Sequence, residues 1–453
     1  MLTVHDTLSG RDVAFEPRTP GRVSFYVCGP TVYDVAHLGH GRTAVVFDTM
    51  RRYFASSDYA VTFVSNVTDV DDRIIAKAAA EGTTEPEIAA RYSASYWADL
   101  ERLGCSRPDE IPHATEFIDR MQALIAELVD SGHAYVIEGE GVYFAVENYP
   151  GYGELSHRRV DDLLEGAGAR VEVDEQKRSP IDFALWKAAK PGEPTWESPW
   201  GPGRPGWHIE CSAMSLEILG AGFDLHGGGD DLVFPHHENE RAQAEAAGHA
   251  FARYWVHSGM VTVGGDKMSK SLQNFTTLAE ALDAHDPRAF RLAVLQTHYR
   301  SQQELGPEVL AEAEQALSRL DALVRKAARE GVGPNTSDPE TIATFRAAMD
   351  ADFGTPAAIG AIFDAVRNAN TAIDGRDLKR AEALVAAVRE LTDLVGLELR
   401  TSEDADDEID ALIARRVAAR RDGDYAEADR IRAELAARGI TLEDGPDGTT
   451  WHR

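Results

Sequence analysis

An alternation of strand and helix patterns near the start of the chain constrains its fold more than any other feature. Residues 22–28 (RVSFYVC) and 60–66 (AVTFVSN) are short apolar runs of the kind that buried strands show. Between them, apolar residues recur at four-residue spacing from Val46 to Phe54, which predicts a helix over 38–55. A strand, a crossover helix and a second strand favour parallel pairing. We therefore predict an α/β fold with a doubly wound parallel sheet.

The remaining sequence indicates an inserted region, a helical region and a tail. Residues 134–206 begin with a hairpin pattern and continue with a stretch rich in Gly, Pro and Trp, which fits an inserted domain. Helix patterns return at 208–219 and 236–247, and we expect a loop with the glycines of 227–229 to join them. From about residue 277 onward the pattern is almost wholly helical, which predicts a bundle. A small module closes the sequence.

The composition excludes several classes of protein. Lys and Arg together number 46 and Asp and Glu 76, so the formal charge of −30 argues against nucleic-acid binding over the whole surface. A local basic groove is still compatible with that charge. No apolar run approaches the ~20 residues of a membrane helix, and residues 1–11 lack the pattern of a secretory signal. Three cysteines cannot form a disulfide framework, so we expect a cytoplasmic protein that does not bind a membrane.

A first chemical motif, His37-Leu38-Gly39-His40, lies at the start of the predicted helix. A helix N-terminus attracts anions, and a glycine there lets a bulky ligand approach the backbone. Two imidazoles at this place can donate hydrogen bonds to phosphate oxygens. The residues alone leave a second interpretation open, in which the segment is a capping turn with two incidental histidines.

A second motif, Lys267-Met268-Ser269-Lys270-Ser271, follows a glycine-containing turn and holds two of the eight lysines of the chain. Two ammonium groups on one mobile loop could close over a triphosphate and stabilise the charge on pyrophosphate as it leaves. The alternative interpretation is a solvated basic loop without a ligand.

A third set of residues has the chemistry of a zinc site. His236 and Glu240 are four residues apart, so they lie on one face of a predicted helix. Cys28 ends the first strand, and Cys211 lies in the segment GWHIEC. Two thiolates, an imidazole and a carboxylate are suitable ligands for Zn²⁺. The alternative is a pair of buried cysteines beside a polar helix face, and Cys105, which has no partner motif, is expected to be buried in that way.

The order and separation of the HxGH and KMSKS motifs resemble those of the class I aminoacyl-tRNA synthetases. Four further segments make the sequence resemble the cysteinyl-tRNA synthetases: FYVCGPTVYDVAHLGHGR, SNVTDVDDRII, PGWHIECSAMS and HGGGDDLVFPHHENE. The resemblance runs through most of the chain and implies a Rossmann-like catalytic domain split by an insertion. One departure is Gln273, because the family usually continues KMSKSLGN where this chain has KMSKSLQN. A glutamine in place of glycine is expected to stiffen the loop after the motif.

The resemblance also implies a role for individual residues. By their match to the family motifs, the zinc ligands are Cys28, Cys211, His236 and Glu240. The residues implied for cysteine binding are Thr68, Trp207, His226 and Asp231. ATP is implied to contact His37, Gly39, His40 and Lys270. Charge in the transition state is implied to be stabilised by His37, His40, Lys267, Lys270 and the Mg²⁺ that accompanies ATP.

These roles imply a two-step ligase reaction. The carboxylate of L-cysteine attacks the α-phosphate of ATP, which gives cysteinyl-adenylate and pyrophosphate. A hydroxyl of the 3′-terminal ribose of tRNA(Cys) then attacks the adenylate. Serine differs from cysteine only by oxygen in place of sulfur, so shape separates the two poorly, whereas direct binding of the thiolate by one Zn²⁺ per chain would separate them well. We expect the protein to act as a monomer.

The resemblance gives a domain order for the whole chain. The predicted boundaries are 1–120 and 201–250 for the two halves of the catalytic domain, 121–200 for the inserted connective-peptide domain, 251–305 for a linking domain with KMSKS, 306–400 for a tRNA-binding helical bundle, and 405–453 for an anticodon-binding module. In that module, Arg415, Arg416, Arg420 and Arg421 form either a basic patch or a solvated helix face. Trp451 either stacks on a base or caps a small core.

Two alternatives to a tRNA ligase remain open at this point. A paralogous ligase would activate cysteine in the same way and pass it to an amino sugar, as in mycothiol synthesis, but such proteins lack the C-terminal module that this chain has. A non-catalytic tRNA-binding protein descended from a synthetase would not need intact HxGH and KMSKS motifs. Exchange of pyrophosphate with ATP in the presence of cysteine separates the ligases from the binding protein, and charging of tRNA separates the two ligases.

Overall fold

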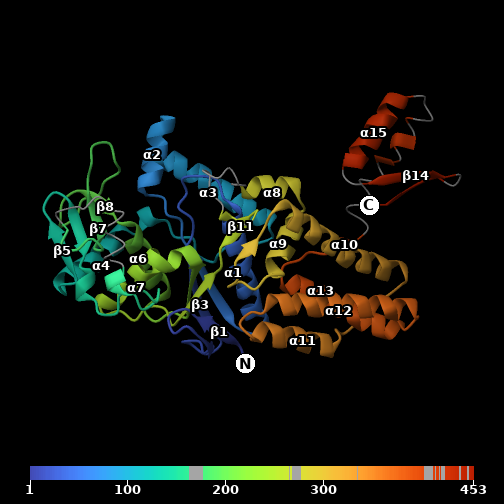
Figure 1. The fold of residues 1–453 in the computed structure, drawn as a ribbon, viewed down its shortest axis with the longest axis horizontal. Coiled ribbons are helices and arrows are strands. Elements are labelled where there is room, and N and C mark those ends of the chain that lie inside the picture. Colours follow the sequence, from blue (N-terminus) through green and yellow to red (C-terminus); the bar gives the residue numbers. More distant parts are fainter. Residues whose placement is uncertain are drawn as a thin grey trace. The chain divides into compact units, whose positions relative to one another are not determined.

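The computed structural model confirms the predicted α/β fold and its parallel sheet (Figure 1). It describes residues 1–162, 177–264, 266–267, 277–333, 335–401, 412–413, 415–417, 419, 424–437, 440–445 and 448–452. The central sheet has the strand order β10-β9-β3-β4, and each neighbouring pair is parallel. Its strands are β3 (Arg22–Val27), β4 (Ala60–Ser65), β9 (Leu225–Gly229) and β10 (Tyr254–Ser258).

Helices cover both faces of this sheet, because successive residues of a strand point to opposite sides. Two helices that contact it are α1 (Leu38–Ser56) and α6 (Trp207–Leu219). Phe25 of β3 meets Phe47 of α1 edge to face, with ring centroids 5.6 Å apart. The next residue, Tyr26, belongs to a different part of the core, together with Met214 of α6. This arrangement is the doubly wound sheet that the sequence predicted.

One predicted connection is wrong. We expected residues 227–229 to form a loop, but these glycines lie in strand β9, between β3 and β10. The physical reason is a close contact with α1, since a Cβ on Gly227 would lie 2.6 Å from the ring of Phe47. A strand made of glycine carries none of the β-branched or aromatic side chains that mark a strand in a sequence.

The helix predicted around His236 begins later than expected. Val233–His237 forms a wide turn, η4, which is interrupted at Phe234, where the backbone is extended with φ −138° and ψ 129°. The regular helix α7 spans Glu238–Ala246. His236 therefore precedes α7, but the four-residue spacing still brings its ring to Glu240.

The inserted region has an antiparallel sheet of its own, in the order β5-β6-β7-β8. The predicted hairpin is confirmed, because β5 (Ala134–Ile137) pairs with β6 (Gly141–Phe144). The sequence did not predict β7 (Phe183–Ala188) and β8 (Gly203–Pro205), which complete the sheet. Helix α4 (Ile118–Asp130) precedes this sheet in the chain, and a single residue separates β8 from α6.

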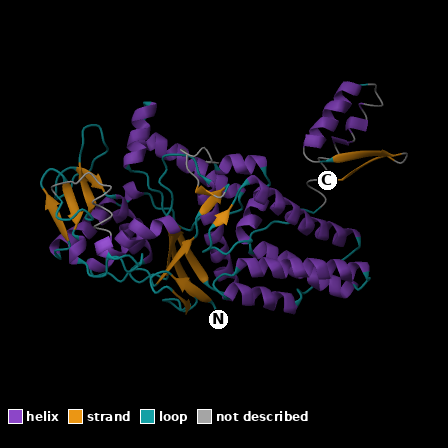
Figure 2. Cartoon of the chain, viewed as in Figure 1, coloured by secondary structure: helices purple, strands orange, loops and turns teal. Residues whose placement is uncertain are grey.

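Unit 1 contains further helices and strands besides these two sheets and their helices (Figure 2). They are β1 (Thr3–Asp6), β2 (Arg11–Ala14), α2 (Asp72–Glu81), α3 (Glu85–Arg102), β11 (Val261–Val263), β12 (Asp266–Lys267), α8 (Leu278–Ala284), α9 (Pro287–Leu295) and β13 (Gln303–Glu304). Strand β11 pairs antiparallel with β12 and parallel with β13. Among the described helices, none is long and apolar enough to cross a membrane.

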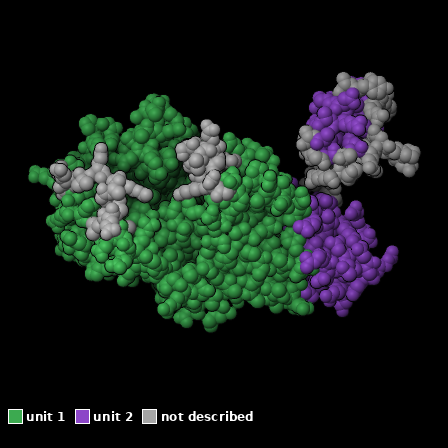
Figure 3. All heavy atoms as spheres, viewed as in Figure 1, with its two compact units in different colours: residues 1–317, 339–364, 390–397 green, residues 318–338, 365–389, 398–453 purple. Residues whose placement is uncertain are grey.

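The chain divides into two compact units (Figure 3). Unit 1 comprises residues 1–317, 339–364 and 390–397, and unit 2 comprises 318–338, 365–389 and 398–453. The predicted helical region contains α10 (Pro307–Arg329), α11 (Pro339–Asp350), α12 (Thr355–Asp374) and α13 (Leu378–Leu394). The tail contains α15 (Tyr425–Ala437), β14 (Thr441–Gly445) and β15 (Gly448–His452) around a small core of Leu412, Ile413, Ile431, Leu435 and Ile440. The domain boundaries given above stay predictions.

Candidate active site

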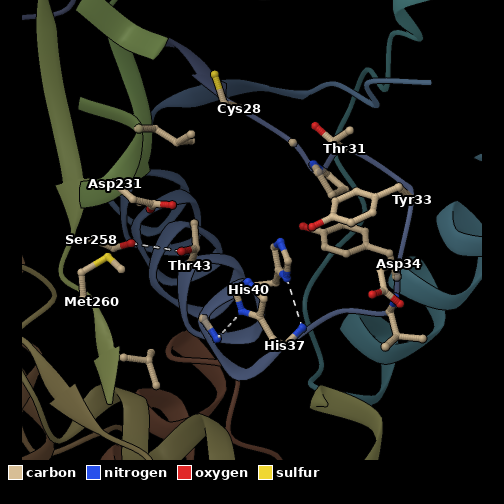
Figure 4. Close-up of a pocket in the computed structure, with 18 of the residues that line it drawn as sticks. Cys28, Thr31, Tyr33, Asp34, His37, His40, Thr43, Asp231, Ser258 and Met260 are labelled. Carbon is tan, nitrogen blue, oxygen red and sulfur yellow. Dashed lines mark hydrogen bonds between the residues drawn. The ribbon is translucent and has the colours of Figure 1, made fainter. Parts of the chain in front are cut away.

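A cavity of about 350 Å³ opens at the carboxyl ends of the parallel strands (Figure 4). Cys28 follows β3, Gly229 ends β9 and Ser258 ends β10, and all three line this cavity. His37 and His40 line it from the start of α1, on the side opposite Cys28. Ligands of open parallel sheets bind at this edge, outside the carboxyl ends of the strands.

The two histidines of the HxGH motif cap helix α1. The ring Nδ1 of His37 accepts the backbone N–H of Gly39 at 3.1 Å, and the ring Nδ1 of His40 accepts the backbone N–H of His37 at 3.1 Å. A ring nitrogen that accepts a hydrogen bond carries no proton, so these bonds place the proton of each neutral ring on Nε2. Both interpretations of the motif therefore apply, since the segment is a capping turn whose histidines also line the cavity.

Burial keeps both imidazoles neutral. Burial, with a smaller effect from the neighbouring His37, lowers the pKa of His40 to about 3. Burial also lowers the pKa of His37, although the carboxylate of Asp231 acts in the opposite direction. At neutral pH each ring then has one N–H donor, and the helix N-terminus adds its positive dipole end. This end of the cavity can donate hydrogen bonds to an anion.

The four predicted zinc ligands lie together in one buried cluster. One ligand atom each from Cys28, Cys211, His236 and Glu240 lies within 4.8 Å of the other three. Sγ of Cys28 is 3.4 Å from Oε1 of Glu240, and Nε2 of His236 is 3.1 Å from the same oxygen. Because Cys28 also lines the cavity, a metal ion held by this cluster would lie at the cavity wall.

A second group of four shares two of these residues. Cys28 and Glu240 also lie within 4.8 Å of ring nitrogens of His226 and His237. Nε2 of His226 forms a hydrogen bond to Oε2 of Glu240 at 2.8 Å, and Nδ1 of His237 forms one to Nε2 of His257 at 2.8 Å. His226, which the resemblance implied for cysteine binding, is fully buried and does not line the cavity. Its contact in the structure is with the carboxylate of Glu240.

The electrostatics of the cluster suit a cation. Burial raises the pKa of the Cys28 thiol well above its ordinary value, and the nearby thiol of Cys211 raises it further. Such a thiol needs a neighbouring positive charge to become a thiolate. Two buried ring nitrogens, Nδ1 of His226 and Nε2 of His237, have no hydrogen-bond partner among the described residues. Both nitrogens belong to the second group of four, and because unpaired buried polar atoms are costly, they suit a cation in or beside the cluster.

Of the other three residues implied for cysteine binding, two line the cavity and one does not. Trp207 and Asp231 line the cavity, and the Trp207 ring stacks on His236 with centroids 4.3 Å apart. Thr68 is buried and does not line the cavity. Its hydroxyl donates a hydrogen bond to Oε2 of Glu210 at 3.0 Å. Its backbone N–H donates to the carbonyl of Pro30, a residue that does line the cavity, at 3.1 Å.

Sequence reasoning missed two buried polar residues beside the cluster. Oδ1 of Asn66 accepts the backbone N–H of Gly29 at 2.9 Å and lies 3.7 Å from Sγ of Cys211. Glu210 is 1% exposed, burial raises its pKa well above the usual range, and it accepts the hydrogen bond from Thr68. Each residue had a signal in the sequence. Asn66 is a polar residue directly after an apolar strand, and Glu210 is an acidic residue in the predicted helix segment HIEC.

The KMSKS motif lies mostly outside the described residues. The backbone of Lys267 belongs to β12, which pairs with β11. Met260, which lines the cavity, directly precedes β11, so the strand that leads toward the motif starts at the cavity wall. Lys270 and Gln273 lie outside the described residues.

In the tail, the expected arginine patch needs correction. Arg416 is 3% exposed, because it lies on the helix face that also buries Ile413. Arg415 is exposed and pairs with Glu427 at 2.9 Å. Residues 420–421 lie outside the described part of the chain. An exposed patch of four arginines is therefore not present as predicted, since one of the four is buried.

Two other single-residue expectations can be compared with the structure. Cys105 is only partly buried, contrary to expectation, and its Sγ lies 3.7 Å from Nη1 of Arg291. The backbone of Trp451 belongs to β15, opposite Leu442 of β14. The side chain of Trp451 is outside the described part of the chain, so its role stays a prediction.

Models of three known domains match successive parts of the chain. The catalytic domain of class I (C) tRNA synthetases matches residues 14–315, and a DALR domain matches residues 344–400. The anticodon-binding domain of cysteinyl-tRNA ligases matches residues 402–451. The three matches follow the same order as the predicted catalytic, helical and C-terminal regions.

Known proteins resemble this chain along its whole length. The cysteine–tRNA ligase of Alkalilimnicola ehrlichii is 52% identical over 464 residues, and that of Halorhodospira halophila is 48% identical over 463 residues; each match covers 100% of both chains. Among solved structures, methionyl-tRNA synthetase of Mycobacterium tuberculosis with methionyl-adenylate has a TM-score of 0.60 at 16% identity, over 86% of this chain and 94% of that one, which shows the fold alone. The chain belongs to the cysteine–tRNA ligase family of class I aminoacyl-tRNA synthetases.

Proposed function

We propose that this cysteine–tRNA ligase activates L-cysteine in the cavity at the end of the parallel sheet and selects it through a zinc ion held by Cys28, Cys211, His236 and Glu240. The observation that carries the proposal is the convergence of these four side chains within 4.8 Å, at the wall of the cavity that the HxGH histidines also line. The reaction is the activation of cysteine by ATP with Mg²⁺, followed by transfer to the 3′-terminal ribose of tRNA(Cys).

The chemistry of the ligands favours this set over the group with His226 and His237. Zinc in proteins prefers sulfur and nitrogen ligands, and the proposed set contains two thiols instead of one. Nε2 of His226 bonds to Oε2 of Glu240 at 2.8 Å, whereas Nε2 of His236 lies 3.1 Å from the other oxygen, Oε1, which Cys28 also contacts. A histidine that bonds to a ligating carboxylate is typical of the outer shell of a metal site, where it orients the ligand. We assign that role to His226.

A bound zinc ion would supply a direct bond to the sulfur of the substrate, which the hydroxyl of serine cannot match. The surrounding residues shape the space for the amino acid. Trp207 stacks on His236 at the cavity wall, which holds the imidazole in place. Asn66, which follows β4, contacts the Cys211 thiol on α6 and the backbone of Gly29 after β3, so it links these three elements at the wall.

The opposite end of the cavity has the groups for adenylate formation. The neutral rings of His37 and His40 donate through Nε2 to phosphate oxygens, and the N-terminus of α1 attracts the same negative charge. Lys267 and Lys270 add positive charge as pyrophosphate leaves. No side chain needs to form a covalent intermediate, because the carboxylate of cysteine is itself the nucleophile. Catalysis is therefore positioning and charge stabilisation.

Transfer to tRNA uses regions that lie after the cavity in the sequence. The DALR match and the anticodon-binding match cover residues 344–400 and 402–451, and we propose that these parts hold the tRNA while its 3′ end enters the cavity. Because translation takes place in the cytoplasm, we place the protein there.

The test is ATP–pyrophosphate exchange with cysteine and with serine, followed by charging of tRNA(Cys). We expect exchange with cysteine, almost none with serine, and charging of the tRNA. Exchange without charging would favour the amino-sugar ligase. Equal exchange with both amino acids would contradict selection by zinc.

A further inference from the structure

The buried guanidinium of Arg42 lies close to the HxGH motif but has no role in the reaction described above. Arg42 is 1% exposed. Residues of an α-helix advance by about 100° each, so Arg42 lies about 200° around the axis of α1 from His40. It does not line the cavity. The histidines and the guanidinium thus extend from nearly opposite sides of the same helical turn.

Backbone carbonyls from two segments surround this guanidinium. Nη1 donates hydrogen bonds to the carbonyls of Gly259 at 2.7 Å and Met260 at 2.9 Å. On the second segment, residues 298–301, Nη2 donates to three carbonyls, among them Tyr299 at 3.1 Å. No described carboxylate forms an ion pair with it, and burial lowers the pKa of Arg42 to about 10, so it is still charged at neutral pH. The cation is held by backbone dipoles alone.

Both segments lead into the strands next to the KMSKS motif. Met260 directly precedes β11, and Ser301 lies shortly before β13, the strand that pairs with β11. On the other side of β11, Thr262 lies opposite Lys267 of β12. The two segments touch each other closely, since a Cβ on Gly259 would lie 2.4 Å from the carbonyl oxygen of Ser301. Whatever fixes these segments also fixes the base of the β11–β12 hairpin.

We propose that Arg42 is a positioning residue, which fixes the HxGH end of α1 relative to the β11–β12 hairpin that carries Lys267. The inference rests on the proposed function, because both motifs must reach the phosphates of one ATP molecule. Catalysis by positioning is sensitive to small displacements, so a shift between the two motifs lowers the rate of adenylate formation. The cysteine end of the cavity, with Cys28, is attached to β3 and should be unaffected.

Lysine cannot replace arginine in this position. The guanidinium presents several donors in a rigid fork, whereas an ammonium is a point charge on a flexible stem. Arg42→Lys keeps the charge but cannot reach both segments at once.

A second buried arginine provides a matched control. Arg291 is 0% exposed, donates to the carbonyls of Leu103 and Val395, and pairs with Asp48, which also lies on α1. None of these partners lines the cavity. Arg291, on α9, therefore provides a comparable buried guanidinium that contacts α1, and Arg291→Lys removes it without disturbing the link between the two motifs.

The experiment measures cysteine-dependent ATP–pyrophosphate exchange in the full chain and in the two lysine variants, below the unfolding temperature of each. In Arg42→Lys we expect kcat to fall about 10²-fold, the effect of an ångström-scale misplacement, with an unchanged KM for cysteine. In Arg291→Lys we expect the kcat of the wild-type chain. This should hold even if its melting temperature falls as far as that of Arg42→Lys. Amide hydrogen exchange over residues 258–263 should be faster only in Arg42→Lys.

An unchanged kcat in folded Arg42→Lys, or equal losses of kcat in both variants, would overturn the inference. If Arg42→Lys does not fold, Thr43→Val takes its place, because the Thr43 hydroxyl links α1 to the hydroxyl of Ser258 at 3.1 Å (Figure 4). Its loss should lower kcat without raising the KM for cysteine, and an unchanged kcat would count against the proposal. If the wild-type chain shows no cysteine-dependent pyrophosphate exchange, the proposed function is contradicted instead. The amide hydrogen exchange over residues 258–263 then decides whether Arg42 positions the two segments.

Discussion

The thiol of Cys28 donates a hydrogen bond to the carboxylate of Glu240 at 3.4 Å, although 212 residues separate them in the sequence. Cys28 reaches this point because β3 ends there, and Glu240 reaches it from the first turn of α7. His236 approaches the same carboxylate oxygen to 3.1 Å. Three side chains from two distant parts of the chain thus meet around one oxygen atom, and their ligand atoms lie close enough together to share one cation.

The first prediction concerns metal content. The purified protein should contain about one zinc ion per chain, and Cys211→Ser should lose most of it, because a hydroxyl is a poor zinc ligand at neutral pH. Metal analysis after gel filtration measures this. Cys105→Ser is the matched control, since Cys105 belongs to neither group of ligands. Full zinc content in Cys211→Ser would exclude the proposed ligand set.

The second prediction separates a ligand from the residue that orients it. His226→Asn should keep the zinc site but weaken its affinity roughly 10- to 100-fold, the usual cost of losing an outer-shell partner. His236→Asn should lose far more affinity. Competition with a chelator of known zinc affinity gives both values. The reverse order, with His226→Asn as the more damaging change, would assign the metal to the group of His226 and His237.

The third prediction concerns the double role of His37, which caps α1 and lines the cavity. His37→Ala should lose the cap, at about 1 kcal/mol of stability, and should slow pyrophosphate exchange. His37→Asn restores a good capping residue but no imidazole, so its stability should return while its rate stays about 10²–10³-fold low. Thermal unfolding and exchange assays measure the two effects. Recovery of the rate in His37→Asn would show that the histidine acts only as a cap.

A fourth prediction concerns the tail. The described residues that line the cavity all precede residue 262, and the tail has a small core of its own. Truncation after Thr401 should therefore leave pyrophosphate exchange intact and raise the KM for tRNA. The affinity lost should depend on salt concentration, because contacts to phosphates release counterions. If truncation lowers exchange and charging equally, the tail stabilises the whole chain and does not read RNA.

A fifth prediction concerns stability in acid. Burial lowers the pKa of His257 to about 3, whereas an unfolded histidine titrates near 6.5. Between these values the unfolded chain binds more protons than the folded chain, so the free energy of unfolding must fall as pH decreases below 6.5. His257 alone should contribute a loss of about 2 kcal/mol between pH 6.5 and 5.

Urea unfolding of the native chain and of His257→Gln over this range tests the fifth prediction. The variant should lose stability less steeply on acidification, and the two curves should run parallel above pH 7. Parallel curves over the whole range would mean that His257 becomes protonated in the folded protein.

The sequence predicted those parts of the site that depend on local spacing. Three of these parts can each be predicted within one segment. They are the strand before Cys28, the helix that starts at the HxGH motif, and the four-residue spacing of His236 and Glu240. The meeting of Cys28 with Cys211 cannot be predicted in this way, because the packing of α6 against β3 over such a distance leaves no trace in either segment. Ligand chemistry made the two cysteines one of two open interpretations, and the resemblance to known synthetases favoured their pairing.

Other parts were hidden for physical reasons. Residues 227–229 are glycines in a strand. A strand is predicted from its periodic apolar side chains, and glycines have none. Asn66 and Thr68 act through a hydrogen bond to each other and through contacts behind the cavity wall, which tertiary structure alone creates. Nothing in the sequence pattern distinguishes Arg42 from the other arginines, yet it is almost fully buried. A buried guanidinium bound to carbonyls has no carboxylate partner that a sequence could reveal.

The order β10-β9-β3-β4 has a consequence for the synthesis of the protein on the ribosome. Phe25 of β3 lies opposite Leu225 of β9, which follows it by 200 residues. At ~5–20 residues per second, roughly 10–40 s pass between the appearance of these two residues. During that time one edge of β3 has no neighbour, and the nascent chain needs protection from aggregation there. The cavity cannot take shape before translation has passed the last strand of the sheet.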